Sequence, residues 1–246
     1  MKAAIAIIPA RGGSKSIRDK NIVQLAGFPL IAFSIAAAKL SSSISRVIVS
    51  TDSEEYAEIA CQFGAEVPFM RPADISGDNA TDIDFMVQAM NWFDNNEPIT
   101  PEYWVHLRPT TPLRDPKHIN EALHQIAYSD DATALRSAFP CAESPFKWFR
   151  HNDEGFLTSL NSDDTDLDKF NLPRQMYPKV FVPDGYVDII RRSFVKKTGR
   201  MHGNKVIGFI SPVCSEVDSV EELRRIEYEI STFGSPLLKY LSEVHR

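Results

Sequence analysis

Residues 3–21 read AAIAIIPARGGSKSIRDKN, and this stretch decides the fold. Its first part, Ala3–Ile8, is a short apolar run of the kind that forms a fully buried strand. The residues that follow hold a Gly-Gly pair, one acid and four cations, namely Arg11, Lys15, Arg18 and Lys20. A flexible basic loop directly after a buried strand predicts an anion site at the carboxyl end of a sheet.

The rest of the first half alternates strand-like and helix-like segments. Further strands are expected at Arg46–Ser50, just after Gly64, and at Tyr103–Leu107, Asp131–Ala138, Gly185–Ile190 and Lys205–Ile210. Helices are expected at Pro29–Leu40, at 53–63 with Asp52 as N-cap, at Thr81–Phe93 and Pro116–Tyr128, and last near Val220–Ser231. This order predicts an α/β fold, a Rossmann-like and mostly parallel sheet with helices on both faces.

Residues 140–183 break the alternation. They contain five prolines, many aromatic residues and an acidic stretch, Ser162–Asp168. This composition predicts an inserted arm rather than another strand–helix unit, with the acidic stretch as a solvated turn rather than a metal site. No long linker interrupts the chain, so residues 1–246 are expected to form one domain that carries this arm.

Composition excludes several classes of protein. The 246 residues are 43% hydrophobic and carry a formal charge of −6, which argues against nucleic acid as the main partner. No apolar run is long enough for a signal peptide or a membrane helix. The three cysteines lie far apart without a CxxC motif, so a reduced, cytoplasmic protein without a disulfide framework is expected.

Four interpretations of the basic loop were compared. A Rossmann dinucleotide site needs G-x-G-x-x-G, a Walker A loop needs G-x-x-x-x-G-K-S/T, and the loop has neither spacing. The third interpretation is a triphosphate loop of another design. In it, the backbone N–H groups of Gly12 and Gly13 approach an anion, while Arg11, Lys15 and Lys20 neutralise the phosphates. The fourth is a solvated basic turn.

The chain resembles the acylneuraminate cytidylyltransferases, also called CMP-sialic acid synthetases. Five blocks carry the resemblance, in the family's order: IPARGGSKSIRDKN, VIVSTDSEEYAEIACQFGAEVPFMRPADISGDNAT, HLRPTTPLRDPKHI, LPRQMYPKVFVPDGYVDII and EVDSVEEL. They span about residues 3–230, as in a short bacterial form. The resemblance implies transfer of CMP from CTP to the anomeric hydroxyl of a nonulosonic acid, such as sialic or legionaminic acid, with release of pyrophosphate. It also implies a role in surface-glycan synthesis, including lipopolysaccharide.

The resemblance assigns nucleotide binding to residues of the first two blocks. Lys20 would stabilise charge at the α-phosphate, with Arg11 and Asp218 as the other catalytic residues. Alternative interpretations are a surface lysine for Lys20, a turn cap for Asn21 and an ordinary helix N-terminus for Thr81. The full nucleotide-binding set is Ala10, Arg11, Gly12, Gly13, Ser14, Lys15, Lys20, Asn21, Arg71, Asn79, Ala80 and Thr81.

Acceptor binding is assigned by the resemblance to the third and fourth blocks. The arm is expected to cross to a second subunit in a homodimer with shared sites, where Lys147 and Arg174 reach the partner's sugar carboxylate. Plain interface packing for these two residues, and a structural salt bridge for Arg108, stay open. The full set is Arg108, Pro109, Thr110, Thr111, Lys147, Arg174, Gln175, Asp184 and Gly185.

Three positions in the third and fourth blocks depart from the family. Arg108 stands where many members have Gln, Val182 where they have Arg, and Asp184 where they have Asn. By the resemblance these departures lie at the sugar pocket, so the identity of the sugar acid stays open. The expected activation reaction is the same whichever sugar acid binds.

Glu216 and Asp218 are the expected metal ligands. Residues i and i+2 of an extended segment face one side, and Mg²⁺ bound to phosphates takes one or two carboxylates. The family has Asp-x-Asp here, so Glu216 is a conservative departure. Alternatively, Asp218 is the N-cap of the last helix, with Glu221 completing a capping box. The six histidines show no ligand spacing and are expected to be structural or surface residues.

Three other functions were considered. An eight-carbon ulosonic acid could replace the nonulosonic acid in the same chemistry. A dinucleotide-dependent oxidoreductase has a similar sheet, but the glycine pattern disfavours it. A catalytically dead, nucleotide-binding regulator is disfavoured because Lys20 and Asp218 are present.

Overall fold

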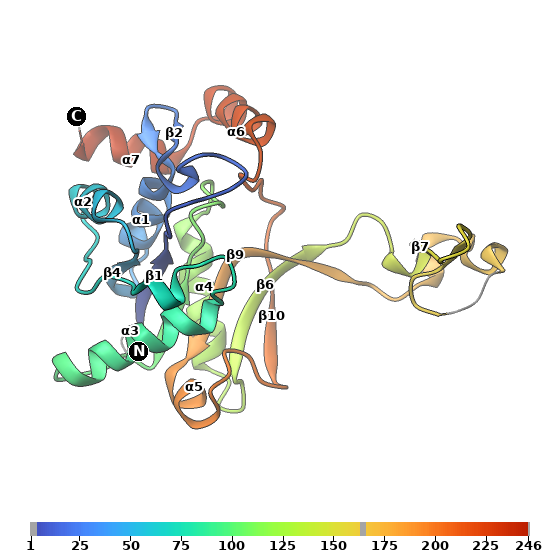
Figure 1. The fold of residues 1–246 in the computed structure, drawn as a ribbon, viewed down its shortest axis with the longest axis horizontal. Helices are drawn as coiled ribbons and strands as arrows, with labels where there is room; N and C mark the ends of the chain where they lie inside the picture. Colours follow the sequence, from blue (N-terminus) through green and yellow to red (C-terminus); the bar gives the residue numbers. More distant parts are fainter. Residues whose placement is uncertain (1–3, 163–165, 246) are drawn as a thin grey trace.

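The computed structural model describes residues 4–162 and 166–245. Ala3 of the first predicted strand and residues 163–165 of the acidic stretch lie outside the described residues. The core is a six-stranded sheet in the order β10-β6-β9-β5-β1-β4 (Figure 1). Its strands are β1 (Ala4–Pro9), β4 (Ile44–Ser50), β5 (Tyr103–His106), β6 (Ala134–Pro140), β9 (Phe181–Arg191) and β10 (Val206–Ile210).

Helices cover both faces, as predicted. The larger core joins one face of the sheet to α1, α2, α4, α6 and α7, and a smaller core joins the other face to α3 and α5. In β1, Ala4, Ala6 and Ile8 face the larger core, while Ile5 and Ile7 face the smaller one. This alternation is the two-residue period of a strand buried on both sides. The helices are α1 (Leu30–Leu40), α2 (Glu54–Gln62), α3 (Asp82–Asn96), α4 (Pro116–Ala127), α5 (Arg192–Thr198), α6 (Val220–Phe233) and α7 (Pro236–Val244).

The sheet is mostly parallel, as predicted, but β9 runs antiparallel to both of its neighbours, β5 and β6. The reason lies in the chain path. Strand β6 leaves the carboxyl edge of the sheet, residues 141–180 extend beyond that edge, and the chain re-enters from the same side. The remaining strand pairs are parallel, so β1, β4, β5, β6 and β10 all end at one edge.

Four local predictions need correction. Asp52 does not cap α2, because Ser53 is the N-cap and its Oγ accepts from the Tyr56 N–H. Gly64 ends that helix with φ +82°, but only an isolated bridge between Ile48 and Glu66 follows instead of a strand. Two helices were not predicted: α5, and α7, which follows the helix expected to be last.

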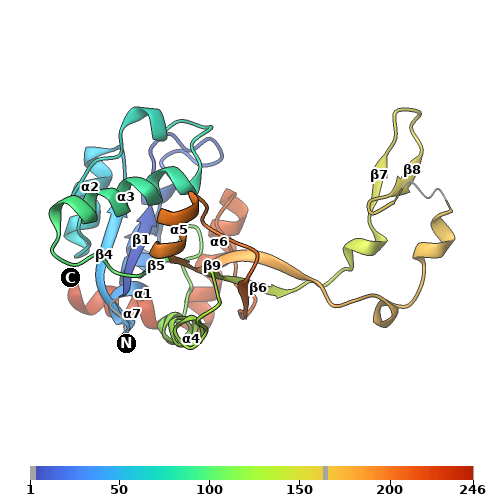
Figure 2. The same ribbon diagram turned by 90° about the horizontal axis from the view of Figure 1, so that it is seen from below.

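Residues 141–162 and 166–180 form an arm that projects well away from the sheet (Figures 1 and 2). Beyond the sheet, the described residues form two small hairpin ladders and five 3₁₀ turns. The ladders are β2–β3 (Gln24–Leu25, Phe28–Pro29) and, in the arm, β7–β8 (Phe149–His151, Leu157–Ser159). The turns are η1 (Lys20–Ile22), η2 (Ala73–Ile75), η3 (Pro145–Lys147), η4 (Leu167–Phe170) and η5 (Arg174–Met176). Among the described residues, no helix is both long and apolar enough to span a bilayer.

Candidate active site

The basic loop follows β1 at the carboxyl edge of the sheet and is fastened at several points. The Gly12 N–H donates to Asp52 Oδ1 at 2.8 Å, so Asp52 holds this loop rather than capping α2. Asn21 Nδ2 donates to the Arg11 carbonyl at 3.0 Å, which closes the loop on itself. Gly13 has φ +70°, a conformation that glycine adopts without a Cβ penalty. The loop is therefore shaped by its own contacts, with its backbone open toward solvent.

A cavity of about 420 Å³ opens beside this loop. Its lining combines the first block with residues of the second and third blocks, which the fold brings to one edge. The predicted site residues in the lining are Arg11, Ser14, Lys15, Lys20, Asn21, Arg71, Ala80, Thr81, Arg108, Pro109 and Thr110. Ala10, Gly12, Gly13, Asn79 and Thr111 belong to the same loops without lining the cavity.

The cations of the loop are paired with acids from other segments. Arg11 Nη1 lies 3.1 Å and Lys15 Nζ 2.5 Å from the two carboxylate oxygens of Asp78. These two cations lower the pKa of Asp78. Lys20 Nζ lies 2.9 Å from Asp218 Oδ1, and the Lys20 side chain is only 16% exposed. A triphosphate bound here would replace the carboxylates of Asp78 and Asp218 as the anionic partners of these cations.

Asp218 reaches Lys20 because its segment is tied to the third block. The N–H of buried Val217 donates to the Thr110 carbonyl at 2.8 Å. Glu216 and Asp218 flank Val217 and so lie at i and i+2. Burial first, and the charge of Asp218 second, raise the pKa of Glu216. Two carboxylates that repel each other in this way fit a divalent cation, since a bound cation relieves the repulsion.

The cap alternative for Asp218 is wrong. Ser219 is the N-cap of α6, and its Oγ accepts from the Glu222 N–H at 3.2 Å. The Glu222 carboxylate accepts in return from the Asp218 N–H at 2.9 Å. Glu221 has no part in this box, and the Asp218 side chain is 61% exposed beside Lys20. Within the described residues no three His, Cys, Asp or Glu side chains gather as a metal cluster, so a magnesium ion here would depend on phosphate ligands as well.

Arg71 and Thr81 support the cavity from the second block. The buried guanidinium of Arg71 donates to Ser50 Oγ and to the Ser50 carbonyl at 3.1 and 2.9 Å, and it lies 4.8 Å from the ring centroid of Phe85. Burial lowers the pKa of Arg71 to about 10. Thr81 is the N-cap of α3 and forms a capping box with Asp84. The helix N-terminus interpretation of Thr81 is therefore correct in structural terms, and the residue lines the cavity as well.

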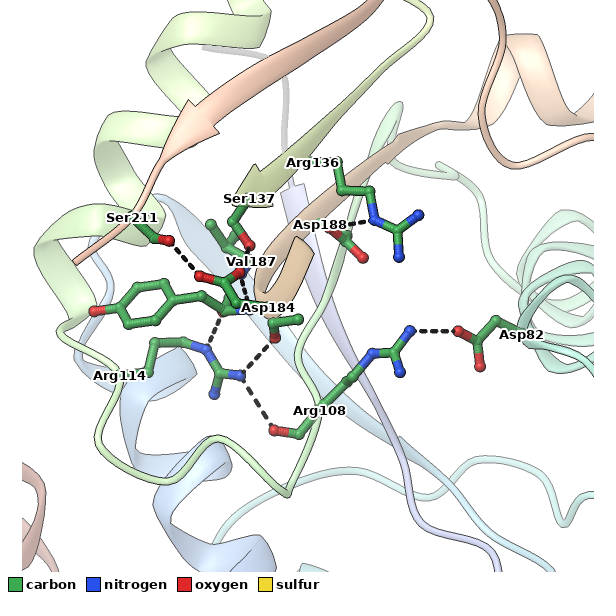
Figure 3. Close-up of polar contacts among 11 residues, drawn as sticks. Asp82, Arg108, Arg114, Arg136, Ser137, Asp184, Val187, Asp188 and Ser211 are labelled. Atoms are coloured by element: carbon green, nitrogen blue, oxygen red, sulfur yellow. Dashed lines mark hydrogen bonds and ion pairs between the residues drawn. The ribbon is translucent and has the colours of Figure 1, made fainter. Parts of the chain in front are cut away.

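On the acceptor side, the structure separates Arg108 from Asp184 (Figure 3). Arg108 Nη2 lies 3.0 Å from Asp82 Oδ2, the salt bridge that was left open as an alternative. Asp184 is 4% exposed, and its carboxylate accepts from Ser137 Oγ at 2.5 Å, from the Tyr186 N–H at 3.0 Å and from Ser211 Oγ. These internal hydrogen bonds occupy Asp184, so its predicted contact with the sugar would need them to change.

Arg114 is the support for this region that sequence reasoning missed. Its fully buried guanidinium donates to Ser34 Oγ at 3.0 Å and to the carbonyls of Arg108, Gly185 and Tyr186. Burial lowers its pKa to about 10. Gly185, with φ +61°, has no room for a Cβ, which would lie 2.7 Å from Arg108 Cδ. Arg114 therefore fixes the backbone that carries Arg108. The absence of a Cβ on Gly185 leaves room for the side chain of Arg108.

The predicted residues of the arm do not lie in the cavity of their own chain. Arg174 Nη2 donates to the Cys141 carbonyl at 2.8 Å, and Lys147 Nζ lies 5.8 Å from the ring centroid of Tyr177. Arg174 and Gln175 line a second cavity of about 720 Å³ at the base of the arm. Their substrate role stays a prediction that depends on a second subunit.

The basic loop, the acids and the cavity at the carboxyl edge define a nucleotidyltransferase-like fold, and solved structures agree. CMP:2-keto-3-deoxy-manno-octonic acid synthetase complexed with CTP superposes with a TM-score of 0.69 over 94% of this chain and 99% of that one, at 16% identity. The cytidylyltransferase family model matches residues 5–156. The chain therefore belongs to the cytidylyltransferase family.

Curated relatives narrow the comparison. The chain is 32% identical over 231 residues to the N-acylneuraminate cytidylyltransferase of Escherichia coli O18:K1:H7, covering 92% of this chain and 51% of the relative. It is 40% identical over 124 residues to the CMP-N,N'-diacetyllegionaminic acid synthase of Legionella pneumophila, covering 50% and 53%. The matches thus span about half the length of these relatives.

Proposed function

We propose that the protein transfers CMP from CTP to the anomeric hydroxyl of a nonulosonic acid. The observation that carries the proposal is that Arg11 and Lys20 line one cavity at the carboxyl edge while Asp218, two residues from Glu216, contacts Lys20. In the reaction, the anomeric oxygen forms a bond to the α-phosphorus, the bond to pyrophosphate breaks, and the hydroxyl proton is released. The relatives are named for N-acylneuraminate and N,N'-diacetyllegionaminic acid, which supports a nonulosonic acid as acceptor.

Each group at the site has a task in this reaction. Such phosphoryl chemistry depends on positioning and on charge neutralisation rather than on covalent help from the protein. Arg11 and Lys15 would hold the triphosphate, and Lys20 would stabilise the charge that develops at the α-phosphate. Glu216 and Asp218 would hold Mg²⁺, which when bound neutralises charge on the phosphates. Release of Lys20 from Asp218 would accompany CTP binding.

Two measurements test the proposal. Thermal-shift titrations with CTP, UTP, ATP and GTP, each with magnesium, are expected to give the largest shift with CTP. Pyrophosphate release is then measured with CTP and a panel of nonulosonic and eight-carbon ulosonic acids. A larger shift with ATP or UTP would exclude cytidine as the base. Turnover of eight-carbon acids alone would assign the chain to that alternative, and binding of CTP without any turnover would favour the regulator.

We also propose a homodimer in which the arm completes the partner's site. Arg174 and Lys147 lie on the projecting arm, and large apolar side chains are exposed along it. They are Trp148, Phe149, Phe156, Leu157, Leu160, Leu172, Met176 and Phe181. An exposed apolar surface of this kind is typical of a protein interface.

The cysteines Cys61, Cys141 and Cys214 are free thiols, which supports the reducing cytoplasm, where CTP is available, as the location of the protein.

The shared site is tested with Arg174→Ala. We expect its KM for the sugar acid to rise by about tenfold or more, the loss of a charge-assisted contact, while the KM for CTP stays nearly unchanged. Mixing Arg174→Ala with Lys20→Ala protein should restore activity, because one site of the heterodimer has both residues. Heterodimers without restored activity would mean that Arg174 serves its own subunit.

A further inference from the structure

A second group of polar side chains lies beside Arg108, and most of it has no partner. Eleven buried side-chain polar atoms lack a hydrogen-bond partner across residues 4–162 and 166–245, and six of them lie in this one region. We call the five residues that carry them the polar compartment. The atoms are His106 Nδ1 and Nε2, Arg108 Nε, Arg136 Nε, Asp188 Oδ1 and His202 Nε2.

The sheet register places three of these residues in one row. His106 of β5 is the register partner of Asp188 of β9, and Asp188 is the register partner of Arg136 of β6. Residues directly opposite each other across neighbouring strands project from the same face, here the face covered by α3 and α5. Figure 3 shows the side chains of Arg136 and Asp188 beside those of Arg108 and Asp82, on the opposite side of β9 from the Asp184 network.

The ion pair in this row is loose. Arg136 Nε lies 3.9 Å from Asp188 Oδ1, which is too long for a hydrogen bond. The Asp188 side chain is 3% exposed and that of Arg136 is 41% exposed. A buried polar atom without a partner costs stability, and this region concentrates several of them around a side chain that reaches solvent. A ligand that entered past Arg136 could satisfy them.

Charge and protonation define the chemistry of that ligand. Burial lowers the pKa of His106 to about 4 and also lowers the pKa of His202, so both imidazoles are neutral at pH 7. Burial raises the pKa of Asp188 to about 6, which leaves it ionised at pH 7. Asp82, which faces the compartment as the partner of Arg108, is the second carboxylate. Two guanidinium groups and two carboxylates then cancel, while donors and acceptors are both present.

We propose that the polar compartment receives an acylamino substituent of the acceptor sugar acid, its carbonyl accepting from Arg136 and its N–H donating to Asp188. A carboxylate, a phosphate or an amine would bring a net charge into a buried region whose own charges cancel, and burying an uncompensated charge is costly. An amide is neutral and supplies one donor and one acceptor. Phe85, whose ring centroid lies 5.5 Å from that of His106, and Met201, which packs on the same core, offer apolar surface for the acyl group. This proposal rests on the proposed function.

The compartment continues from the cavity of the nucleotide. His106 and Arg108 line that cavity together with Arg11 and Lys20, whereas Arg136, Asp188 and His202 do not belong to its lining. A group that reaches Asp188 would therefore lie beyond the residues that hold the triphosphate. This placement assigns the compartment to the acceptor rather than to CTP.

The test compares two nonulosonic acids that differ only by an acetamido group or a hydroxyl at one carbon. The comparison is repeated for each carbon that carries such a group. Wild-type protein is expected to prefer the acetamido compound, by about tenfold or more in kcat/KM, at one of these carbons. Arg136→Met should lose about tenfold of this preference with the KM for CTP within about twofold of wild type. Asp188→Asn should act in the same direction.

Matched controls separate this effect from general damage. Arg224→Met changes an exposed arginine of α6, and Asp131→Asn changes an exposed carboxylate; both should keep the preference. If Asp188→Asn fails to fold, the half-exposed Arg136 still decides the question. An unchanged preference in Arg136→Met, or a wild-type preference for the hydroxyl, would overturn the proposal. A selective rise in the KM for CTP would reassign the compartment to the nucleotide. Absence of turnover with every nonulosonic acid would instead contradict the proposed function.

Discussion

The two ends of the cavity hold their charges in opposite ways. At the basic loop, the cations Arg11, Lys15 and Lys20 each contact a carboxylate that is half-exposed or more, on Asp78 or Asp218. At the polar compartment, buried atoms of Asp188 and His106 lack partners within the described part of the chain. Exposed ion pairs contribute little to stability and exchange readily, whereas buried unpaired groups are costly. The first end is thus ready to exchange anions, and the second is built around a neutral polar group.

The largest effect should come from Asp218→Asn. The amide removes a charge that a hard cation needs, and it also leaves Lys20 without a charged partner. We expect kcat for pyrophosphate release to fall by about 10³-fold, as when a main electrostatic stabiliser of a transition state is lost. Steady-state kinetics across a magnesium titration measure this.

The controls for Asp218→Asn lie in the same segment. Glu221→Gln in the first turn of α6 should be nearly silent, because Ser219 and Glu222 form the cap. Glu216→Asp shortens the second carboxylate and should stay active. If Asp218→Asn keeps more than about a tenth of the wild-type rate, the loss is far smaller than expected for a metal-linked charge. Asp218 would then not be one of the catalytic residues.

Lys20→Ala should have the next largest effect. Its ammonium group is mostly buried against Asp218, and we expect kcat to fall by about 10²-fold while CTP still binds. Arg18→Ala is the matched control, since Arg18 belongs to the same loop but its side chain is 96% exposed. Single-turnover rates and CTP titrations separate chemistry from binding. Near-normal turnover in Lys20→Ala would make Lys20 an ordinary surface-loop lysine.

The polar compartment should reveal itself through stability. The folded-state pKa of Asp188, about 6, is above its ordinary value. Its carboxyl group therefore favours folding when protonated, and this contribution is lost as the pH rises from about 4 through 6. Asp188→Asn should thus raise Tm at pH 8 by about 4 °C, if it recovers roughly half of the free energy of a two-unit pKa shift. At pH 4 it should leave Tm nearly unchanged. Asp131→Asn is the exposed control. A lower Tm at pH 8 would mean that the carboxylate stabilises the unliganded protein.

These two ends also differ in how far sequence alone could find them. The basic loop is a contiguous motif after an apolar strand, so its place at the carboxyl edge followed from the β1 pattern. Asp218 and Thr110 could be predicted only through the family resemblance, because the Val217–Thr110 hydrogen bond that places Asp218 depends on how the segment after β10 folds back. The alternative that made Asp218 the cap of α6 arose because Asp218–Glu221 has the same spacing as the actual cap, Ser219–Glu222.

Apart from Arg108, the residues of the polar compartment were missed because they are scattered singly over three strands and a loop. Their neighbours were nevertheless informative. Arg136 and Asp188 are charged residues inside strands that are mostly apolar, ALRSAF and YVDII, and an ionisable residue in a buried strand often marks a site. The antiparallel direction of β9, which brings Asp188 opposite both His106 and Arg136, could not be predicted from the strand–helix alternation, since it results from the arm.

The smallest effect should come from Asp78→Asn. Asp78 is an exposed carboxylate that contacts both Arg11 and Lys15, so in the unliganded protein it occupies the cations that the triphosphate needs. Its removal should lower the KM for CTP by about threefold at low salt, the scale of an exposed ion pair. The difference should vanish at high ionic strength because such pairs are screened. Asp74→Asn, on the same exposed segment, is the control and should leave the KM for CTP unchanged at both low and high ionic strength. If the KM for CTP rises instead, Asp78 shapes the basic loop for binding. Of the ion pairs at the basic loop, only that of Lys20 with Asp218 would then be one that CTP exchanges.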